Sequence, residues 1–241
     1  MVTSMTEQPF TAPLESVRKR IQEETQRLLG DTIGISDDDW NRPSLLPGWS
    51  RAHVAAHVAA NAEALAQLVR AAVRGAPVEL YPDEQVRLAG IERGSSMTGL
   101  ELQISLDTSA GQLERAFDEV EDWTIPVTLM GRELTLAHVP TARLVVVVVH
   151  HLDLDCGFGI DRLDPVTTRW LLQWTLTRYA DEPDLPALRI ESTSDLTGEL
   201  GRGGDRRLVT GGDGALWGWL MGRLPSRDVE GADGLVLGLR S

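Results

Sequence analysis

The chain has 241 residues, and its content of 42% hydrophobic and 24% charged residues is typical of a folded protein rather than a disordered one. The net charge of −13 argues against nucleic-acid binding and against docking on anionic membranes, because both partners need a basic protein face. The single cysteine, Cys156, excludes an intrachain disulfide, and no apolar run is long enough to span a bilayer, so we expect a cytoplasmic protein.

Four segments in the first two thirds of the chain carry the signals of long helices. Apolar residues recur at helical spacing in the first segment, Ser50 is a favourable N-cap for the second, and Thr98 with Glu101 forms a capping box before the third. In the fourth, the five valines at 145–149 favour a strand, but Pro140 and the flanking positions indicate a helix. The helices are expected over residues 13–29, 50–74, from 98 onward, and over 140–157.

The connections between these helices are predicted to be loops and one hairpin. Residues 37–49 and 76–96 are expected to be irregular, and the second connection is long enough to have a function of its own. Residues 123–136 alternate in polarity and turn at Met130 and Gly131, which predicts a β-hairpin.

The last third of the chain consists of short segments separated by glycine-rich turns. We expect a helix over 165–178, strands over 188–192 and 207–210, a short helix from Asp213, and a last strand over 234–239. The predicted fold class is therefore α+β. It combines a four-helix bundle over residues 1–160 with a small α+β domain over residues 161–241.

Histidines gather in two pairs on the predicted helices. His53 and His57 are four residues apart and share a helix face. The second pair is His150 and His151, and Asp153 follows His150 by three residues on the same helix face. Imidazole is the commonest side-chain ligand of divalent transition metals, and helix bundles build metal sites from facing helices. Spacing alone leaves open whether these are metal ligands or ordinary surface and core histidines. Asp153 could equally bind the metal, orient a histidine or pair with an arginine.

Two motifs give these histidines a context. The run Leu46–Arg51 reads Leu-Pro-Gly-Trp-Ser-Arg and precedes His57, and Arg143 precedes His150 and Asp153. In these motifs the chain resembles the mycothiol-dependent maleylpyruvate isomerase family, which belongs to the DinB-like metal-binding helix bundles. The resemblance implies a DinB-like four-helix bundle followed by the family's C-terminal α+β domain. It also implies zinc ligands at His57 and His150, with Asp153 as the aspartate that follows them.

One position departs from the family pattern. Where the resemblance implies a third zinc ligand, a glutamate four residues before His150, this chain has Val146. Two histidines are fewer than the three protein ligands of a usual catalytic zinc site. Four interpretations stay open: zinc binds weakly, another group such as Asp153 substitutes, this chain does not use zinc, or Val146 is an engineered substitution.

The resemblance also singles out residues for the substrate. Tyr81 and Arg87 lie before Gly94 and Ser95 as in the family's Tyr–Arg–Gly-Ser segment, and Arg223 matches the arginine of the C-terminal Gly-Arg motif. The resemblance implies that Arg87 and Arg223 are catalytic and that they bind substrate together with Tyr81. Guanidinium groups suit a dicarboxylate because they bind carboxylates through two parallel hydrogen bonds.

These observations lead to two functional hypotheses. The first is a mycothiol-dependent enzyme, a monomer acting on a small unsaturated carboxylic acid as a cis–trans isomerase or an S-transferase, with a metal-activated thiolate. The second, motivated by Val146, is a metal-free bundle repurposed to bind a small molecule or to catalyse different chemistry.

Overall fold

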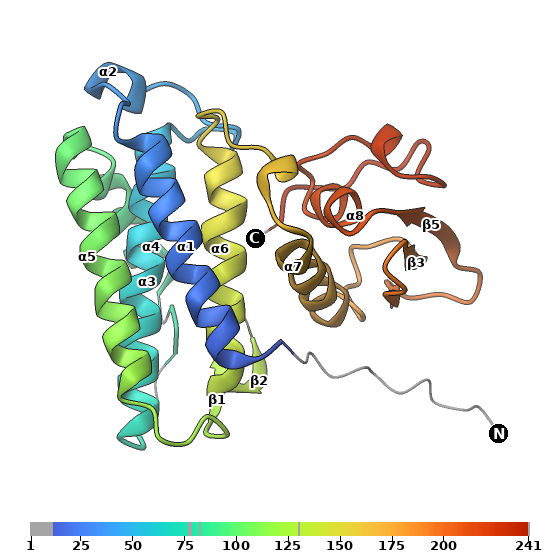
Figure 1. The fold of residues 1–241 in the computed structure, drawn as a ribbon, viewed down its shortest axis with the longest axis horizontal. Coiled ribbons are helices and arrows are strands. Elements are labelled where there is room, and N and C mark those ends of the chain that lie inside the picture. Colours follow the sequence, from blue (N-terminus) through green and yellow to red (C-terminus); the bar gives the residue numbers. More distant parts are fainter. Residues whose placement is uncertain (1–11, 77–78, 82, 130, 241) are drawn as a thin grey trace. The chain divides into compact units, whose positions relative to one another are not determined.

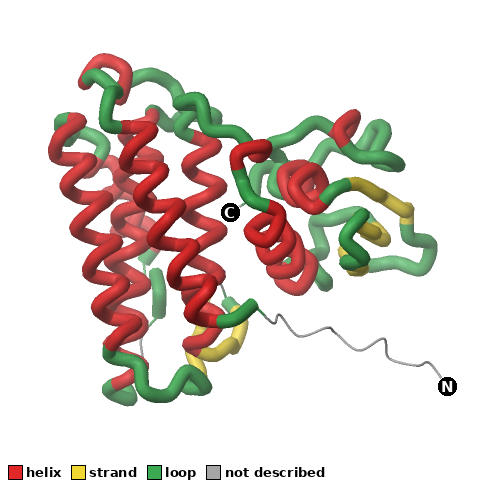
Figure 2. The backbone as a smooth tube through the Cα atoms, in the orientation of Figure 1, coloured by secondary structure: helices red, strands yellow, loops and turns green. Residues whose placement is uncertain are grey.

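The computed structural model describes residues 12–76, 79–81, 83–129 and 131–240. These residues divide after Phe158: Leu14–Phe158 form one compact unit, here called the helical unit, and the chain from Gly159 onward belongs to a second unit. Helices predominate in the first unit, while the second combines helices with a sheet (Figure 2). The predicted α+β class is confirmed.

Four long helices lie side by side in the helical unit (Figure 1). They are α1 (Leu14–Thr32), α3 (Arg51–Val73), α5 (Gly99–Asp118) and α6 (Val139–Asp153). Helices α1 and α3 each pack against both α5 and α6, so that every member of the four has two neighbours. All four occur where the sequence predicted helices, although α1 continues through Gly30 to Thr32.

Helix α6 forms in spite of its five valines. Every residue from Val139 to Asp153 is buried, against α1 on one side and α3 on another. The weak strand preference of β-branched residues is therefore outweighed by the burial of a whole helix. Pro140 lies in the first turn, where its missing N–H costs nothing. The helix ends at Asp153, four residues earlier than the sequence suggested.

Two connections predicted as irregular contain helices. Asp83 caps α4 (Glu84–Gly94) by accepting hydrogen bonds from the backbone N–H groups of Gln85 and Val86. Helix α4 packs on α3, so part of the expected 76–96 loop is a helix. Ser36 likewise caps the short α2 (Asp37–Trp40), whose Trp40 side chain is buried.

The predicted hairpin is confirmed. Strands β1 (Pro126–Leu129) and β2 (Arg132–Thr135) pair antiparallel, with Val127 opposite Leu134. Met130, which the sequence placed in the turn, lies outside the described residues. The hairpin leads directly into η1 (Leu136–His138) and α6.

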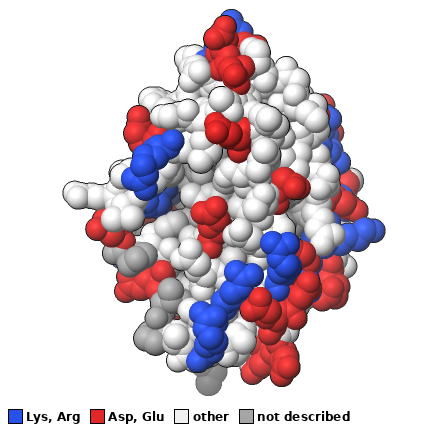
Figure 3. Space-filling view, turned by 90° about the vertical axis from the view of Figure 1, so that its left-hand side faces the viewer, with Lys and Arg blue, Asp and Glu red and all other residues white. Residues whose placement is uncertain are grey.

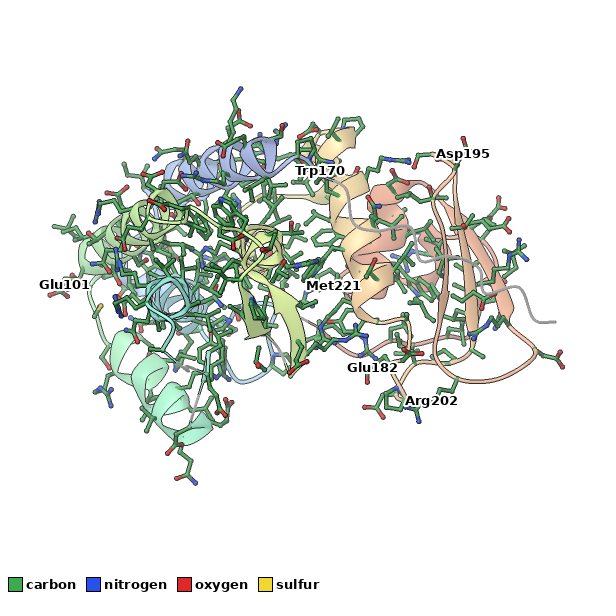
Figure 4. The ribbon with its side chains drawn as sticks, turned by 90° about the horizontal axis from the view of Figure 1, so that it is seen from below. Glu101, Trp170, Glu182, Asp195, Arg202 and Met221 are labelled. Carbon is green, nitrogen blue, oxygen red and sulfur yellow. The ribbon has the colours of Figure 1, made fainter. Side chains whose placement is uncertain are left out.

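The second unit contains α7 (Pro165–Arg178), α8 (Asp213–Leu220) and a three-stranded sheet. Its central strand β3 (Leu188–Ser192) pairs antiparallel with β4 (Thr197–Leu200) and parallel with β5 (Arg207–Gly211). Figure 4 labels Asp195 in the turn between β3 and β4, and Arg202 in the connection from β4 to β5.

Two sequence interpretations in this unit were wrong. Strand β4 was not expected, because its sequence Thr-Gly-Glu-Leu has weak strand propensity. The strand expected over 234–239 is absent from the described residues there; Val236 is 94% exposed, so the apolar alternation has no surface to cover.

Acidic and basic side chains are interspersed over the face shown in Figure 3, and neither sign of charge dominates the described surface in that view. Among the described helices, none is both long and apolar enough to cross a membrane.

Candidate active site in the helical unit

The start of α3 sets the direction of its two histidines. Ser50 is the N-cap, and His53 at the third position completes the capping box by accepting a hydrogen bond from the Ser50 backbone N–H. The other ring nitrogen of His53, Nε2, lies 3.0 Å from Glu92 Oε2 on α4. His53 is therefore engaged in capping and in a hydrogen bond to Glu92. The histidine one turn later, His57, is left for the interior of the unit.

His57 meets His150 across the packing of α3 against α6. The two ring centroids are 4.7 Å apart and the ring planes are nearly perpendicular, at 87°. The indole of Trp49, held in the turn before α3, contacts the edge of His57 with centroids 5.6 Å apart. The structure thus brings together the two histidines that the sequence singled out from distant segments.

Asp153 lies beside His150 rather than beside His57. Its Oδ2 atom is 2.9 Å from His150 Nδ1, and both side chains are buried. A carboxylate in this place fixes the orientation of the imidazole and directs the other ring nitrogen away from itself. The position of Asp153 supports the orienting role among those the sequence left open.

A chain of hydrogen bonds connects α6, α3 and the segment before α4. Nη1 of Arg143 donates to the backbone oxygen of Val58 at 2.7 Å and to Asn61 Oδ1 at 2.9 Å. Asn61 Nδ2 donates in turn to the Tyr81 hydroxyl at 3.0 Å. Sequence reasoning did not assign a role to Arg143 or Asn61. The available signal was their spacing, because Asn61 follows His57 by four residues and Arg143 precedes His150 by seven.

Arg87 completes this group from α4. Its guanidinium carbon lies 5.4 Å from the centroid of the Tyr81 ring, and its Nη1 is 3.4 Å from His57 Nδ1. Two further hydrogen bonds, of 2.6 and 2.7 Å, join Arg87 to Glu84 one turn earlier. We call Arg87, Tyr81, Asn61 and Arg143 the guanidinium cluster. The sequence placed Arg87 in a loop, whereas a helix holds it.

Burial and positive charge shape the electrostatics of this cluster. Burial, then the neighbouring His150 and the guanidinium groups of Arg87 and Arg143, lower the pKa of His57 to about 2. Burial raises the pKa of Tyr81, and it lowers the pKa of Arg143 to about 10. At neutral pH His57 and Tyr81 are therefore uncharged, and Arg143 is a cation.

The side chains at the histidine pair do not supply the ligands of the zinc site that the resemblance implies. His57 and His150 offer two imidazoles, the carboxylate of Asp153 is held at His150 Nδ1, and Val146 occupies the place of the expected glutamate. Across the described ranges, no group of three or more His, Cys, Asp or Glu side chains is placed to hold a metal ion. The two nearby guanidinium groups add further positive charge. These residues do not fit a tetrahedral zinc site with three protein ligands.

Arg223, the remaining predicted site residue, belongs to the second unit. It follows α8, and its Nη1 donates to the backbone oxygens of Met221 and Arg240. Figure 4 labels Met221 directly after α8. Its role toward substrate stays a prediction that rests on the resemblance.

The pKa of His57 predicts how stability depends on pH. An unfolded histidine binds a proton near pH 6.5, whereas the folded His57 stays neutral, so stability falls as the pH drops below 6.5. Between pH 7.5 and 5.0 this single group should remove about 2 kcal/mol from the free energy of unfolding. Urea unfolding at both pH values should show that His57→Asn loses about 2 kcal/mol less than the parent. An equal loss in both proteins would contradict the neutral state of the half-buried His57.

Comparison with known proteins places this site in a family. The solved structures that match include the mycothiol-dependent maleylpyruvate isomerase, at 25% identity, and a histidine-to-alanine mutant of it, at 24%. Each has a TM-score of 0.83 and covers 94% of this chain and 95% of its own. No curated protein gave a match. Residues 21–155, which include the histidine pair and the guanidinium cluster, match the model of the mycothiol maleylpyruvate isomerase N-terminal domain. The chain therefore belongs to the mycothiol maleylpyruvate isomerase N-terminal domain family.

Proposed function

We propose that this chain is a mycothiol-dependent enzyme that isomerises a small unsaturated dicarboxylic acid of the maleylpyruvate type from cis to trans. The observation that carries the proposal is the position of Arg87, whose guanidinium lies against both Tyr81 and His57 in the part of the chain that matches the family. A positively charged, partly enclosed group of this kind suits an anionic substrate and an anionic thiolate.

The residues of the chain have distinct tasks in this proposal. Arg87 binds a carboxylate of the substrate and stabilises the negative charge that develops on the adjoining carbonyl during reaction. Arg223 is proposed as the second arginine that binds the substrate, and Tyr81 packs beside Arg87. His150 is held in one orientation by Asp153. Mycothiol, when bound, supplies the thiol that adds to the double bond and leaves again once rotation has occurred.

The metal-activated thiolate suggested by the sequence has no part in the proposal. The donor set at His57 and His150 has no third ligand among the described residues, and the residue one helical turn before His150 is the apolar Val146. A guanidinium group also lowers the pKa of a nearby thiol, because it favours the charged form. The chain's own cations are therefore the groups that would hold the thiolate. Cytoplasmic location and a monomeric state stay predictions from the sequence.

A second candidate function is favoured by Val146. A metal-free member of the family could retain the anion-binding groups and yet bind a small molecule or catalyse different chemistry. Transfer of mycothiol to another electrophile is instead the alternative to isomerisation within the first proposal. The S-transferase shares the first step of the isomerase, because in both the thiolate attacks an electrophilic carbon. These candidates differ in their products.

Incubation of the purified protein with mycothiol and maleylpyruvate distinguishes them. Formation of fumarylpyruvate that requires both the protein and mycothiol supports the isomerase. Absence of fumarylpyruvate, together with a loss of free thiol to monochlorobimane that is faster with the protein than without it, supports the S-transferase. If neither reaction occurs in a folded protein, the repurposed bundle is the remaining candidate. Parallel assays with added zinc and with a chelator test whether any activity depends on metal.

A further inference from the structure

Arg143 carries a buried charge that no carboxylate in the described part of the chain balances. Its side chain is 1% exposed. Burial lowers its pKa only to about 10, so the guanidinium is still a cation at neutral pH. Its Nη1 has two acceptors, the backbone oxygen of Val58 and the amide oxygen of Asn61, and both are neutral. Among the described residues no carboxylate pairs with it. A buried charge without a counter-charge costs several kcal/mol, which indicates that an anion from outside the chain completes this group.

One edge of the guanidinium makes no hydrogen bond to the described residues. The Nε–H of Arg143 is buried and has no hydrogen-bond partner within the described ranges. The edge formed by Nε and Nη2 is the one through which arginine binds a carboxylate with two parallel hydrogen bonds. Both acceptors found among the described residues lie at Nη1, so they leave this second edge without a partner.

The acidic groups near the cluster are engaged elsewhere. Glu84 accepts two hydrogen bonds from Arg87, and Asp153 lies at His150 Nδ1. On α6 the position one turn after Arg143 and one turn before His150 is Val146, which offers no charge. The positive charges of Arg143 and Arg87 also act on His57 and Tyr81. They contribute to the lowered pKa of His57, and they oppose the rise that burial causes in the pKa of Tyr81.

We propose that Arg143 is a substrate-binding residue, whose Nε–Nη2 edge holds a carboxylate of a small dicarboxylic acid beside Asn61 and Tyr81. The choice of a dicarboxylate rests on the proposed function. Asn61 positions the guanidinium through Nη1, and it connects Arg143 to the Tyr81 hydroxyl. The hydroxyl proton of Tyr81 has no acceptor among the described residues, so it is available to a second carboxylate oxygen. Arg143 and Arg87 then flank one anion.

The test measures binding of maleate, a cis-dicarboxylate, by isothermal titration calorimetry without thiol or added metal. The parent should bind maleate but not its neutral dimethyl ester. Arg143→Gln should weaken maleate binding at least tenfold, while Arg70→Gln, which removes a surface ion pair with Glu119, should leave it unchanged. Removal of the unbalanced charge should also leave the melting temperature of ligand-free Arg143→Gln at or above that of the parent.

Each outcome decides the matter. Unchanged maleate affinity in Arg143→Gln overturns the proposal, as does failure of the parent to bind maleate. If Arg143→Gln does not fold, Val146→Glu is measured in its place. A carboxylate three residues from Arg143 should compete with maleate for the guanidinium and lower the affinity for maleate at least tenfold. Unchanged maleate affinity in Val146→Glu overturns the proposal. Isomerase activity insensitive to Arg143 would leave the proposed function standing without this inference. Maleate binding that depends on Arg143, in a protein without isomerase activity, would support this inference and contradict the proposed function.

Discussion

Replacing Val146 by glutamate should raise the affinity for zinc by at least tenfold, which corresponds to about 1.4 kcal/mol. Helices α3 and α6 run in opposite directions at the site, because His57 lies opposite His150 while Asn61 lies opposite Arg143. Position 146 falls between these two contacts on α6. A carboxylate there would join the two imidazoles as a third ligand and would supply the negative charge that the dication needs.

The same substitution has a second consequence in the absence of metal. From the sequence alone, a glutamate at this position buries an unpaired carboxylate and should cost a few kcal/mol. The structure reduces this cost, because Arg143 lies one turn away with no carboxylate partner in the described part of the chain. We therefore expect the free energy of unfolding of metal-free Val146→Glu to lie within about 2 kcal/mol of that of the parent.

Thermal unfolding with and without zinc checks both statements. Added zinc should raise the melting temperature of Val146→Glu more than that of the parent. Val146→Gln, which has the same shape without the charge, should gain no such response. His57→Ala in the Val146→Glu background should abolish it. If Val146→Glu binds no more zinc than the parent, position 146 does not face both histidines, and the proposed arrangement of the site is wrong.

The histidine pair could be predicted from the sequence because helical spacing and two local motifs identified His57 and His150. His57 follows a recognisable helix start, and His150 and Asp153 share one turn, so their faces follow from helix geometry. Arg143 was not predicted as a site residue, since its importance lies in burial without a counter-charge. Burial depends on packing between α3 and α6, which no local pattern reports.

The element that carries Arg87 was missed for a related reason. The segment 76–96 contains prolines and little apolar periodicity, which favoured a loop, yet Asp83 caps a helix in it. Most exposed positions of α4 need no apolar partner, so its hydrophobic pattern is weak although Ile91 and Gly94 are buried against the unit. The opposite error occurred at residues 234–239, where alternating apolar residues predicted a strand that does not form. Alternation alone does not supply a neighbouring strand to pair with.

Replacing Arg87 by glutamine should lower kcat/KM for the isomerisation about 100-fold, or about 2.7 kcal/mol. Hydrogen bonds from a guanidinium to a carboxylate contribute about 1.5–3 kcal/mol, and Arg87 is placed to make them next to Tyr81 and His57. The matched control is Arg93→Gln, which removes an exposed guanidinium from the same helix and should leave kcat/KM within about twofold.

The division of this loss between KM and kcat distinguishes two roles of Arg87. A rise in KM alone indicates that the guanidinium binds the ground-state carboxylate, while a fall in kcat indicates that it stabilises charge formed during reaction. Glu84→Gln adds a test of opposite sign. Glu84 now accepts two hydrogen bonds from Arg87, and a substrate carboxylate must compete with it for the same donors. Removal of that negative charge should lower KM, and only if Arg87 itself is present. If Glu84→Gln lowers KM equally in the Arg87→Gln background, Arg87 is not the group that holds the substrate.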